Sequence, residues 1–441
     1  MADSATPRTV DPTGDAVAVA FSGGLDSTAL LHAATRVACR IAGQRVVALH
    51  VHHGLQAQAD DWAVHCERTA RELGAEFSCT RLGGSPAAGD SVEAWARAGR
   101  HRALHDMAVA AGADLLLLAQ HRRDQAETFL LQAMRGAGSA GLAAMPRTQW
   151  RDGVCWARPW LDRPREAIQA YAEQHGLNWI EDPSNDDTRY ARNRLRRLLW
   201  PDFASAEAGL AQAARWAQQA DALAAEVATQ DLALLATAER LDLAALSTLS
   251  PARASNALRA WLSAHTAAPA SLVKRLPAEW RPGGTMSWPA PGGELHAWRD
   301  GLFWAPQSPA PAATAQLDLS RPGRYPQPAW GGTWLVESAG QGVAAARLAH
   351  LTQRGRGGAE QFQRAPASVP RSLKKACQEA GLPPWRRGGP LLFDARQCLV
   401  AVAGLGMDAR AFADQEEPRL ALRWLEDSAL PQSEGEGGAA A

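Results

Sequence analysis

Short apolar segments alternate with amphipathic segments over the first two hundred residues of the chain. Apolar runs of strand length occupy residues 17–21, 46–51 and 115–119, with a further candidate at 76–82. The helical segments between and after them are 28–40, 60–73, 91–111 and 124–134. Strands that alternate with helices form parallel βαβ units. We therefore predict an α/β fold with a doubly wound parallel sheet, whose ligands bind at the carboxyl ends of the strands.

The remaining sequence is long enough for two further domains, because 441 residues suffice for about three. An Ala-rich segment at 206–246 predicts helices, and short strands with one strong helix at 372–380 predict a small α+β domain. The predicted order is a flexible tail at 1–15, the α/β domain at 16–203, a helical middle domain at 204–305, a Pro/Ala-rich linker at 306–314, the α+β domain at 315–426 and a disordered tail at 427–441.

The segment Phe21-Ser-Gly-Gly-Leu-Asp-Ser-Thr28 follows the first predicted strand and opens the first predicted helix. Its two glycines allow a tight turn and a close approach to an anion, and the free N–H groups at a helix start bind phosphate. The loop lacks the lysine of a G-x-x-x-x-G-K-[ST] loop, which argues against chemistry at a terminal phosphate. We predict that ATP binds to Ser22, Gly23, Gly24, Leu25, Asp26 and Ser27, and that Asp26 holds Mg²⁺.

Further motifs accompany this loop along the chain. They are His50-Val-His-His-Gly-Leu55, Gly89-Asp-Ser-Val-Glu-Ala-Trp-Ala-Arg97, Gln120-His-Arg-Arg-Asp-Gln-Ala-Glu-Thr128 with Arg135-Gly-Ala-Gly138, Trp179-Ile-Glu-Asp-Pro-Ser-Asn185 with Arg192-Asn193, and Arg371-Ser-Leu-Lys-Lys375 with Pro383-Pro-Trp385. The loop alone resembles the S-G-G-x-D-S loop of the PP-loop superfamily, whose members split ATP between the α and β phosphates. The combination resembles the tRNA(Ile)-lysidine synthase family over most of residues 17–200 and again over 350–412.

This resemblance implies a two-step reaction that uses ATP and Mg²⁺. ATP adenylates the ring carbonyl oxygen of the wobble cytidine in an isoleucine tRNA with a CAU anticodon, and the ε-amine of free L-lysine then displaces AMP. The partners it implies are that tRNA and L-lysine, without a membrane; a homodimer is left open. The polar N-terminus is no signal peptide and no run has the length of a membrane span, so we expect a cytoplasmic protein.

Asp124 and Glu127 lie three residues apart at the start of a predicted helix, so their side chains share a face. Carboxylates here could locate an incoming ammonium before it loses its proton, or could simply complement the helix dipole. With the resemblance, we predict Asp26, Asp124 and Glu127 as catalytic and Asp26 and Asp124 as metal ligands. The family pattern H-x-D-D-Q-x-E-T has an Asp where this chain has Arg123, so one ligand could be lost.

Basic residues are predicted to contact the tRNA, because arginine forks bind phosphate and phosphate contacts dominate nucleic-acid affinity. The predicted substrate residues are Glu93, Arg97, Arg135, Asn185, Arg192, Asn193, Arg354, Arg371, Lys374, Lys375 and Trp385. Their structural alternatives are an i,i+4 pair for Glu93 and Arg97, a solvated basic face around Arg192, and a core anchor for Trp385.

Three other functions remain open at this point. A PP-loop tRNA thiolation enzyme would use reactive cysteine pairs, but the six cysteines include no C-x-x-C pair. An amidotransferase-type ligase for a small nucleotide would need no basic C-terminal module. The intact loop at Ser22–Ser27 argues against a catalytically inactive RNA-binding protein, but Arg123 leaves that function open. A formal net charge of zero gives no global field for nucleic acid, so any RNA contact depends on local patches.

Overall fold

The computed structural model describes residues 15–52, 59–84, 92–181, 191–237, 239–307, 314–413 and 417–426. The chain divides into two compact units, residues 1–224 and 225–441. Both predicted tails, apart from residue 15, and most of the predicted linker lie outside the described residues. None of the described helices is both long and apolar enough to cross a membrane.

A six-stranded sheet forms the centre of the first unit, in the order β3-β2-β1-β4-β6-β5. The strands are β1 (Ala16–Ala20), β2 (Arg45–His52), β3 (Glu76–Arg81), β4 (Ala113–Leu117), β5 (Thr148–Arg151) and β6 (Val154–Ala157). All neighbours pair in parallel except β5, which forms an antiparallel hairpin with β6. The predicted α/β fold with a doubly wound parallel sheet is confirmed, and the β5–β6 hairpin extends it.

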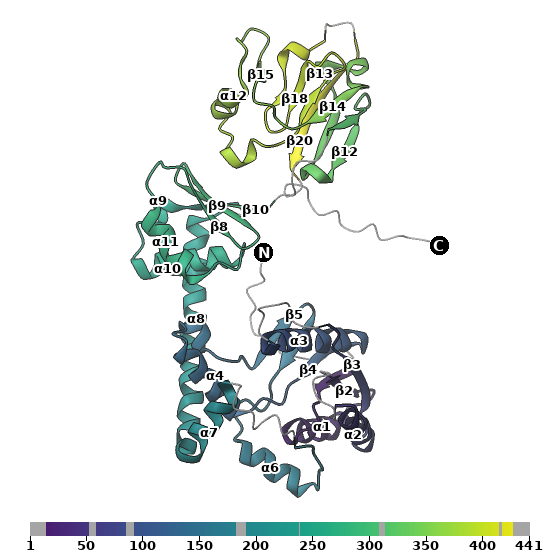
Figure 1. The fold of residues 1–441 in the computed structure, drawn as a ribbon, viewed down its shortest axis with the longest axis vertical. Coiled ribbons are helices and arrows are strands. Elements are labelled where there is room, and N and C mark those ends of the chain that lie inside the picture. Colours follow the sequence, from purple (N-terminus) through teal and green to yellow (C-terminus); the bar gives the residue numbers. More distant parts are fainter. Residues whose placement is uncertain are drawn as a thin grey trace, which may run out of the picture. The chain divides into compact units, whose positions relative to one another are not determined.

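Helices cover both faces of this sheet (Figure 1). α3 (Val92–Ala110) packs on one face, and α1 (Leu25–Ala38) and α2 (Ala59–Glu72) pack on the other. The further helices are α4 (Arg122–Met134), α5 (Ser139–Leu142), α6 (Arg165–Gln174), α7 (Ala191–Phe203) and α8 (Glu207–Leu235), which crosses the division between the units. The side chains of β2 alternate between the two faces: Leu49 packs in the α3 cluster and Ala48 in the cluster of α1 and α2. A strand buried on both faces explains the uninterrupted apolar run in the sequence.

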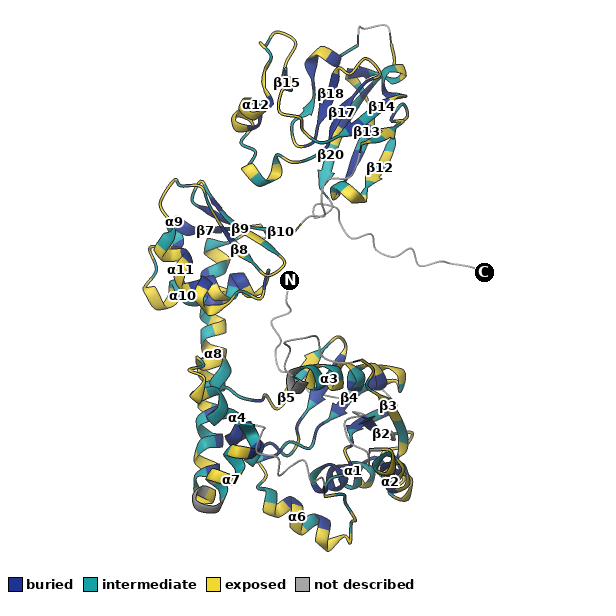
Figure 2. Cartoon of the chain, viewed as in Figure 1, coloured by how far each residue is buried: buried dark blue, intermediate teal, exposed yellow. Residues whose placement is uncertain are grey.

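The middle region contains the predicted helices together with an antiparallel sheet that the sequence pattern did not predict. The helices are α9 (Leu243–Leu246), α10 (Pro251–Ser263) and α11 (Ala270–Glu279). The sheet has the order β7-β10-β9-β8, from β7 (Arg240–Asp242), β8 (Met286–Ala290), β9 (Gly293–Trp298) and β10 (Gly301–Pro306). Fully buried Trp288 and Leu302 anchor its core. Figure 2 shows the buried segments of this region in dark blue.

The C-terminal region packs a five-stranded sheet, β11-β14-β17-β18-β19, against a three-stranded sheet, β12-β13-β20. The strands are β11 (Ala315–Leu317), β12 (Gly323–Gln327), β13 (Gly332–Ala344), β14 (Leu351–Arg354), β17 (Leu391–Phe393), β18 (Leu399–Val402), β19 (Gly406–Met407) and β20 (Arg419–Glu426), with the two-stranded pair β15 (Gln361–Phe362) and β16 (Arg371–Ser372). The one strong helix predicted here is α12 (Leu373–Glu379). This agrees with the predicted α+β domain.

Candidate active site

The glycine loop connects β1 to α1, and the backbone at Gly23 has a left-handed conformation that favours glycine. Gly23 has φ +82°, and a Cβ added there would lie 2.7 Å from Cys66 Sγ. Gly24 caps α1 with extended backbone, so the N–H groups of the first helical turn lie at the loop. The hydroxyls of Ser22 and Ser27 lie 3.1 Å apart. The loop therefore presents hydroxyls and a helix start at the carboxyl end of β1, where a nucleotide phosphate would bind.

A second segment, distant in sequence, contacts this loop. The Ile180 N–H donates to the Gly23 carbonyl oxygen at 2.8 Å, and its side chain would also contact a Cβ at position 23. Ile180 belongs to the motif Trp179–Asn185, so two motifs distant in sequence meet at the loop. The rest of that motif from residue 182, including the predicted substrate residue Asn185, lies outside the described residues.

Asp26 of the loop faces the start of α4. His121 Nε2 lies 3.8 Å from Asp26 Oδ2 and 3.4 Å from Asp124 Oδ2, so one imidazole stands between the two carboxylates. Burial raises the pKa of Asp26, although His121 and then Arg165 oppose this shift. Its Oδ1 atom is buried and has no hydrogen-bond partner. This unsatisfied oxygen is available to a cation that arrives with the substrate.

The carboxylates of α4 are held by arginines from α7. Arg196 Nη2 donates to Asp124 Oδ1 at 3.0 Å and its Nε to Glu127 Oε1 at 2.8 Å. Arg192 Nε lies 3.5 Å from Glu127 Oε2. Burial alone would raise the pKa of Asp124, but His121, Arg196 and Arg192 together lower it. The structure thus brings Asp26, Asp124, Glu127 and Arg192, all predicted, into one cluster.

Asp124 also has the structural role that the sequence left open. The His121 backbone N–H donates to Asp124 Oδ2 at 3.1 Å, which caps the start of α4. Glu127 is fully buried and accepts an additional hydrogen bond from Trp200 Nε1 at 2.9 Å. His121, Arg165 and Trp200 were not predicted as site residues. His121 was present in a motif, whereas Arg165 and Trp200 come from distant segments without a local signal.

Arg123 does not enter this cluster. Its Nε donates to Glu207 Oε2 at 3.0 Å and its Nη2 donates to Glu166 Oε1. Its guanidinium lies over the ring of Trp200, 5.4 Å from the ring centroid. Arg122 binds the other oxygen of Glu207 at 2.8 Å. Arg123 therefore connects the start of α4 to the start of α8, and the site has two α4 carboxylates.

The other predicted substrate residues are spread over the two units. Arg97 is exposed on α3, Arg135 is exposed at the end of α4, and Asn193 is buried in α7. Glu93 belongs to α3, but its side chain lies outside the described residues.

In the C-terminal region the predicted residues form protein contacts or remain at the surface. Arg354 lies 3.6 Å from Glu360, Arg371 lies 3.5 Å from Glu379, and Lys374 and Lys375 are exposed. Trp385 stacks on His296 with ring centroids 4.3 Å apart. Stacking on a protein ring is the anchor role that the sequence left open for Trp385.

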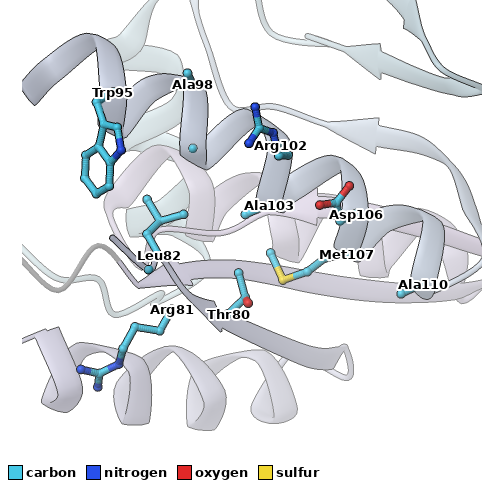
Figure 3. A pocket seen from close by; sticks show the side chains of 12 residues that line it. Thr80, Arg81, Leu82, Trp95, Ala98, Arg102, Ala103, Asp106, Met107 and Ala110 are labelled. Carbon is cyan, nitrogen blue, oxygen red and sulfur yellow. The ribbon is translucent and has the colours of Figure 1, made fainter. Parts of the chain in front are cut away.

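No group of three or more His, Cys, Asp or Glu side chains arranged to hold a metal occurs among the described residues. A pocket of about 500 Å³ lies elsewhere, between the end of β3 and α3 (Figure 3). Trp95, Arg102 and Met107 line it, together with Leu82. None of the carboxylates described above lines this pocket, so it is separate from the candidate active site.

Comparison with known proteins agrees with the fold of the chain. Residues 4–203 match the family model of the PP-loop domain, so the first unit is a PP-loop nucleotide-binding domain. Residues 241–303 match the TilS substrate binding domain and residues 351–424 the TilS substrate C-terminal domain. The chain belongs to the tRNA(Ile)-lysidine synthase family, whose members are ligases.

Curated relatives are similar over nearly the whole chain. The tRNA(Ile)-lysidine synthase of Ralstonia nicotianae is 44% identical over 419 residues, which cover 90% of each chain. The enzyme of Burkholderia pseudomallei is 38% identical over 437 residues, 88% of each chain. A solved tRNA thiolase from Methanococcus maripaludis is 17% identical, with a TM-score of 0.40, over 46% of this chain and 72% of its own. That likeness is too distant to bear on the reaction.

Proposed function

We propose that the chain joins free L-lysine to the ring carbonyl carbon of the wobble cytidine in the CAU anticodon of an isoleucine tRNA, so that this tRNA reads AUA as isoleucine. ATP first adenylates the carbonyl oxygen and releases pyrophosphate; the lysine ε-amine then displaces AMP. The supporting observation is a shared site, because Asp26 of the nucleotide loop and Asp124 of α4 flank the same His121 imidazole. Nucleotide and amine can therefore meet at one carbon.

In the first step, the loop would hold the phosphates of ATP. The first-turn N–H groups of α1 and the hydroxyl of Ser22 are preorganised donors for charge that develops on the departing pyrophosphate. The Ser27 hydroxyl donates to the Gly24 carbonyl oxygen at 3.0 Å and so holds the loop in shape. A carbonyl oxygen is a poor leaving group and AMP is a better one, so adenylation prepares the ring carbon for attack. Since the loop has no lysine to reach a terminal phosphate, cleavage next to the α phosphate is the chemistry it favours.

Mg²⁺ fits Asp26 better than Asp124. Asp26 Oδ1 is buried without a hydrogen-bond partner, whereas both oxygens of Asp124 already accept hydrogen bonds, from Arg196 and from the His121 backbone. Magnesium commonly binds one or two carboxylates together with substrate phosphates. A bound Mg²⁺ would neutralise charge on the phosphate oxygens. Asp26 is therefore proposed as the main protein ligand, with Asp124 holding the geometry beside it.

In the second step, Glu127 would bind the lysine ε-ammonium, and Asp124 would add a negative charge beside it. Glu127 Oε2 is buried without a hydrogen-bond partner, so it can accept one from the amine. The amine must lose a proton before it attacks. The positive charges of Arg192 and Arg196 in the same cluster disfavour the protonated amine and so favour this loss.

The predicted RNA contacts remain part of the proposal. Arg97, Arg135, Arg192 and Asn193 lie in the α/β domain, with Glu93 and Asn185, while Arg354, Arg371, Lys374, Lys375 and Trp385 lie in the second unit. The tRNA-modifying reaction also supports a cytoplasmic location.

A tRNA thiolation enzyme is the alternative. Burial raises the pKa of the Cys66 thiol, the cysteine beside the loop, to about 12, which makes it a poor nucleophile.

The test measures pyrophosphate release from ATP with transcripts of isoleucine tRNA bearing CAU, with and without free L-lysine. We expect release that requires the transcript, and incorporation of labelled lysine into the RNA. A methionine tRNA transcript with the same anticodon is the matched RNA control. Incorporation of sulfur instead of lysine, or pyrophosphate release independent of RNA, would contradict the proposal.

A further inference from the structure

Cationic side chains gather where α3 faces the β5–β6 hairpin. Arg97 and His101 lie one turn apart on α3, Arg151 ends β5, and Arg158 directly follows β6. Arg151 Nη1 lies 3.3 Å from His101 Nδ1, and the Arg151 guanidinium lies over the ring of Trp156, 5.1 Å from its centroid. We call Arg97, His101, Arg151 and Arg158 the hairpin cluster.

Arg158 is the most deeply buried cation of this cluster. It is 6% exposed, and its Nη1 donates to the Pro146 carbonyl oxygen at 2.9 Å, but its Nε has no hydrogen-bond partner. A buried arginine without a carboxylate partner is costly, because nothing replaces the water that it loses. An unsatisfied donor of this kind is expected where an anionic group of a ligand completes the site.

Arginines are the charged groups that shift the pKa values of Arg158 and His101. Burial, followed by Arg151 and Arg97, lowers the pKa of Arg158 to about 10. Burial, followed by Arg97, Arg151, Arg100 and Arg158, lowers the pKa of His101 to about 4, so this imidazole is neutral at physiological pH. Cations held together at this density attract an anion strongly.

The hairpin cluster continues towards the active site through Arg100. Burial, followed by the charges of Arg97 and Arg192, lowers the pKa of Arg100. Arg192 Nη2 donates to Thr128 Oγ1 at 2.8 Å beside the α4 carboxylates. Arginines of α3 and α7 thus both act on Arg100, which belongs to the same helix as Arg97 and His101.

We propose that the hairpin cluster, with Arg158 and Arg151 as its phosphate-binding forks, holds the RNA backbone next to the base that is modified. The inference rests on the proposed function, since it takes a tRNA as substrate. Arginine forks bind phosphate oxygens bidentately, and such contacts set the register of a nucleic acid on a protein.

The phosphates of ATP could have the same chemistry, but the sheet order favours the RNA. β6 and β5 are separated from β1 by β4, at roughly 5 Å per strand, so the hairpin lies on the order of 10 Å or more from the strand that carries the nucleotide loop.

The test compares Arg151→Gln with Arg147→Gln. Both remove one positive charge near the same hairpin, but Arg147 is already paired with Asp162. Dissociation constants for the isoleucine tRNA transcript are measured over a salt series, together with the KM for ATP. We expect Arg151→Gln to weaken RNA binding several-fold and to reduce the slope of log affinity against log salt by about 0.7 to 0.9, with the KM for ATP unchanged. Arg147→Gln should keep the wild-type slope.

Equal slopes for the two variants would overturn the inference, as would an unchanged slope in Arg151→Gln. A raised KM for ATP with an unchanged RNA slope would assign the cluster to the nucleotide instead. Wild-type protein in the same assay separates the two proposals: tRNA-dependent pyrophosphate release by the wild type supports the proposed function whatever the variants do, and its absence removes that function independently of Arg151.

Discussion

Arg196 Nη2 donates a hydrogen bond to Asp124 Oδ1 at 3.0 Å, and this contact between α7 and α4 ties the last helix of the α/β domain to the candidate active site. The contact is strong for its kind, because both groups are charged and Asp124 is buried. It also makes the stability of the domain depend on the charge of Asp124.

Asp124→Asn is expected to destabilise the protein at neutral pH by about 2 kcal/mol, the scale of a hydrogen bond to a charged group. The pKa of Asp124 is lowered in the folded state by His121, Arg196 and Arg192 against its burial. Its stabilisation is therefore present above the unfolded pKa and is lost as pH falls through the folded pKa. Calorimetry of wild type and variant should show melting temperatures that converge towards acid pH. A difference that grows on acidification would contradict this account.

Asp26→Asn should have the opposite effect on stability. Burial raises the pKa of Asp26 in the folded state, so its contribution is favourable below the unfolded pKa and is lost as pH rises through the folded pKa. At neutral pH the uncharged amide should therefore raise the melting temperature, while tRNA-dependent pyrophosphate release falls about 100-fold or more. Asp26→Glu keeps the charge and should show no such gain in melting temperature. An active, destabilised Asp26→Asn protein would remove Asp26 from the proposed chemistry.

Arg123→Ala tests whether the residue that replaces the family's Asp is structural. Arg123 pairs with Glu207, which is 3% exposed, and with Glu166, so its loss leaves a buried carboxylate with Arg122 as its remaining arginine. We expect a loss of about 1–3 kcal/mol in stability and a kcat within about threefold of wild type in steady-state assays below the melting transition. Arg163→Ala, an exposed arginine beside α6, is the control and should be neutral. A large fall in kcat without a loss of stability would place Arg123 in the chemistry.

The sequence predicted those parts of the site that are local in the chain. The glycine loop can be recognised from a segment of eight residues, and so can the pair Asp124 and Glu127. Loop conformation and helix periodicity are local properties of the chain, which is why short segments predict them. The partners Arg165 and Trp200 could not be predicted, since only the packing of α6 and α7 against the α4 region brings them in. The sheet of the middle region was missed because its β9–β10 turn, Arg299–Asp300, takes left-handed backbone without glycine.

Arg123 departs from the family pattern, but its side chain lies outside the cluster of site carboxylates. From the sequence, an arginine at the position of the family's Asp predicts that a metal or amine ligand is lost. One helical step separates residues 123 and 124, about 100° around the axis, so the two side chains leave α4 in different directions. The partners of Arg123 are Glu207, at the start of α8, and Glu166, in α6, and both come from distant segments of the chain.

Alanine substitutions at the adjacent residues Gly23 and Gly24 test the glycine loop, and Gly24→Ala is the control for Gly23→Ala. Gly23 has φ +82°, and its added Cβ would lie 2.7 Å from Cys66 Sγ. Gly24 has φ −76°, and its added Cβ would come no closer than 3.6 Å to Ser22 Oγ. Gly23→Ala is therefore strained in both backbone and packing, whereas Gly24→Ala is strained in neither.

We expect Gly23→Ala to raise the KM for ATP at least tenfold and to lower stability by about 1–2 kcal/mol from the left-handed backbone alone. Gly24→Ala should change stability by less than about 0.5 kcal/mol. The double variant Gly23→Ala/Cys66→Ala removes the steric contact but keeps the backbone strain, so it should recover part of the lost ATP affinity. ATP titrations of the four proteins decide the matter: a Gly23→Ala protein that binds ATP like wild type would show that the left-handed turn is not needed to form the nucleotide loop.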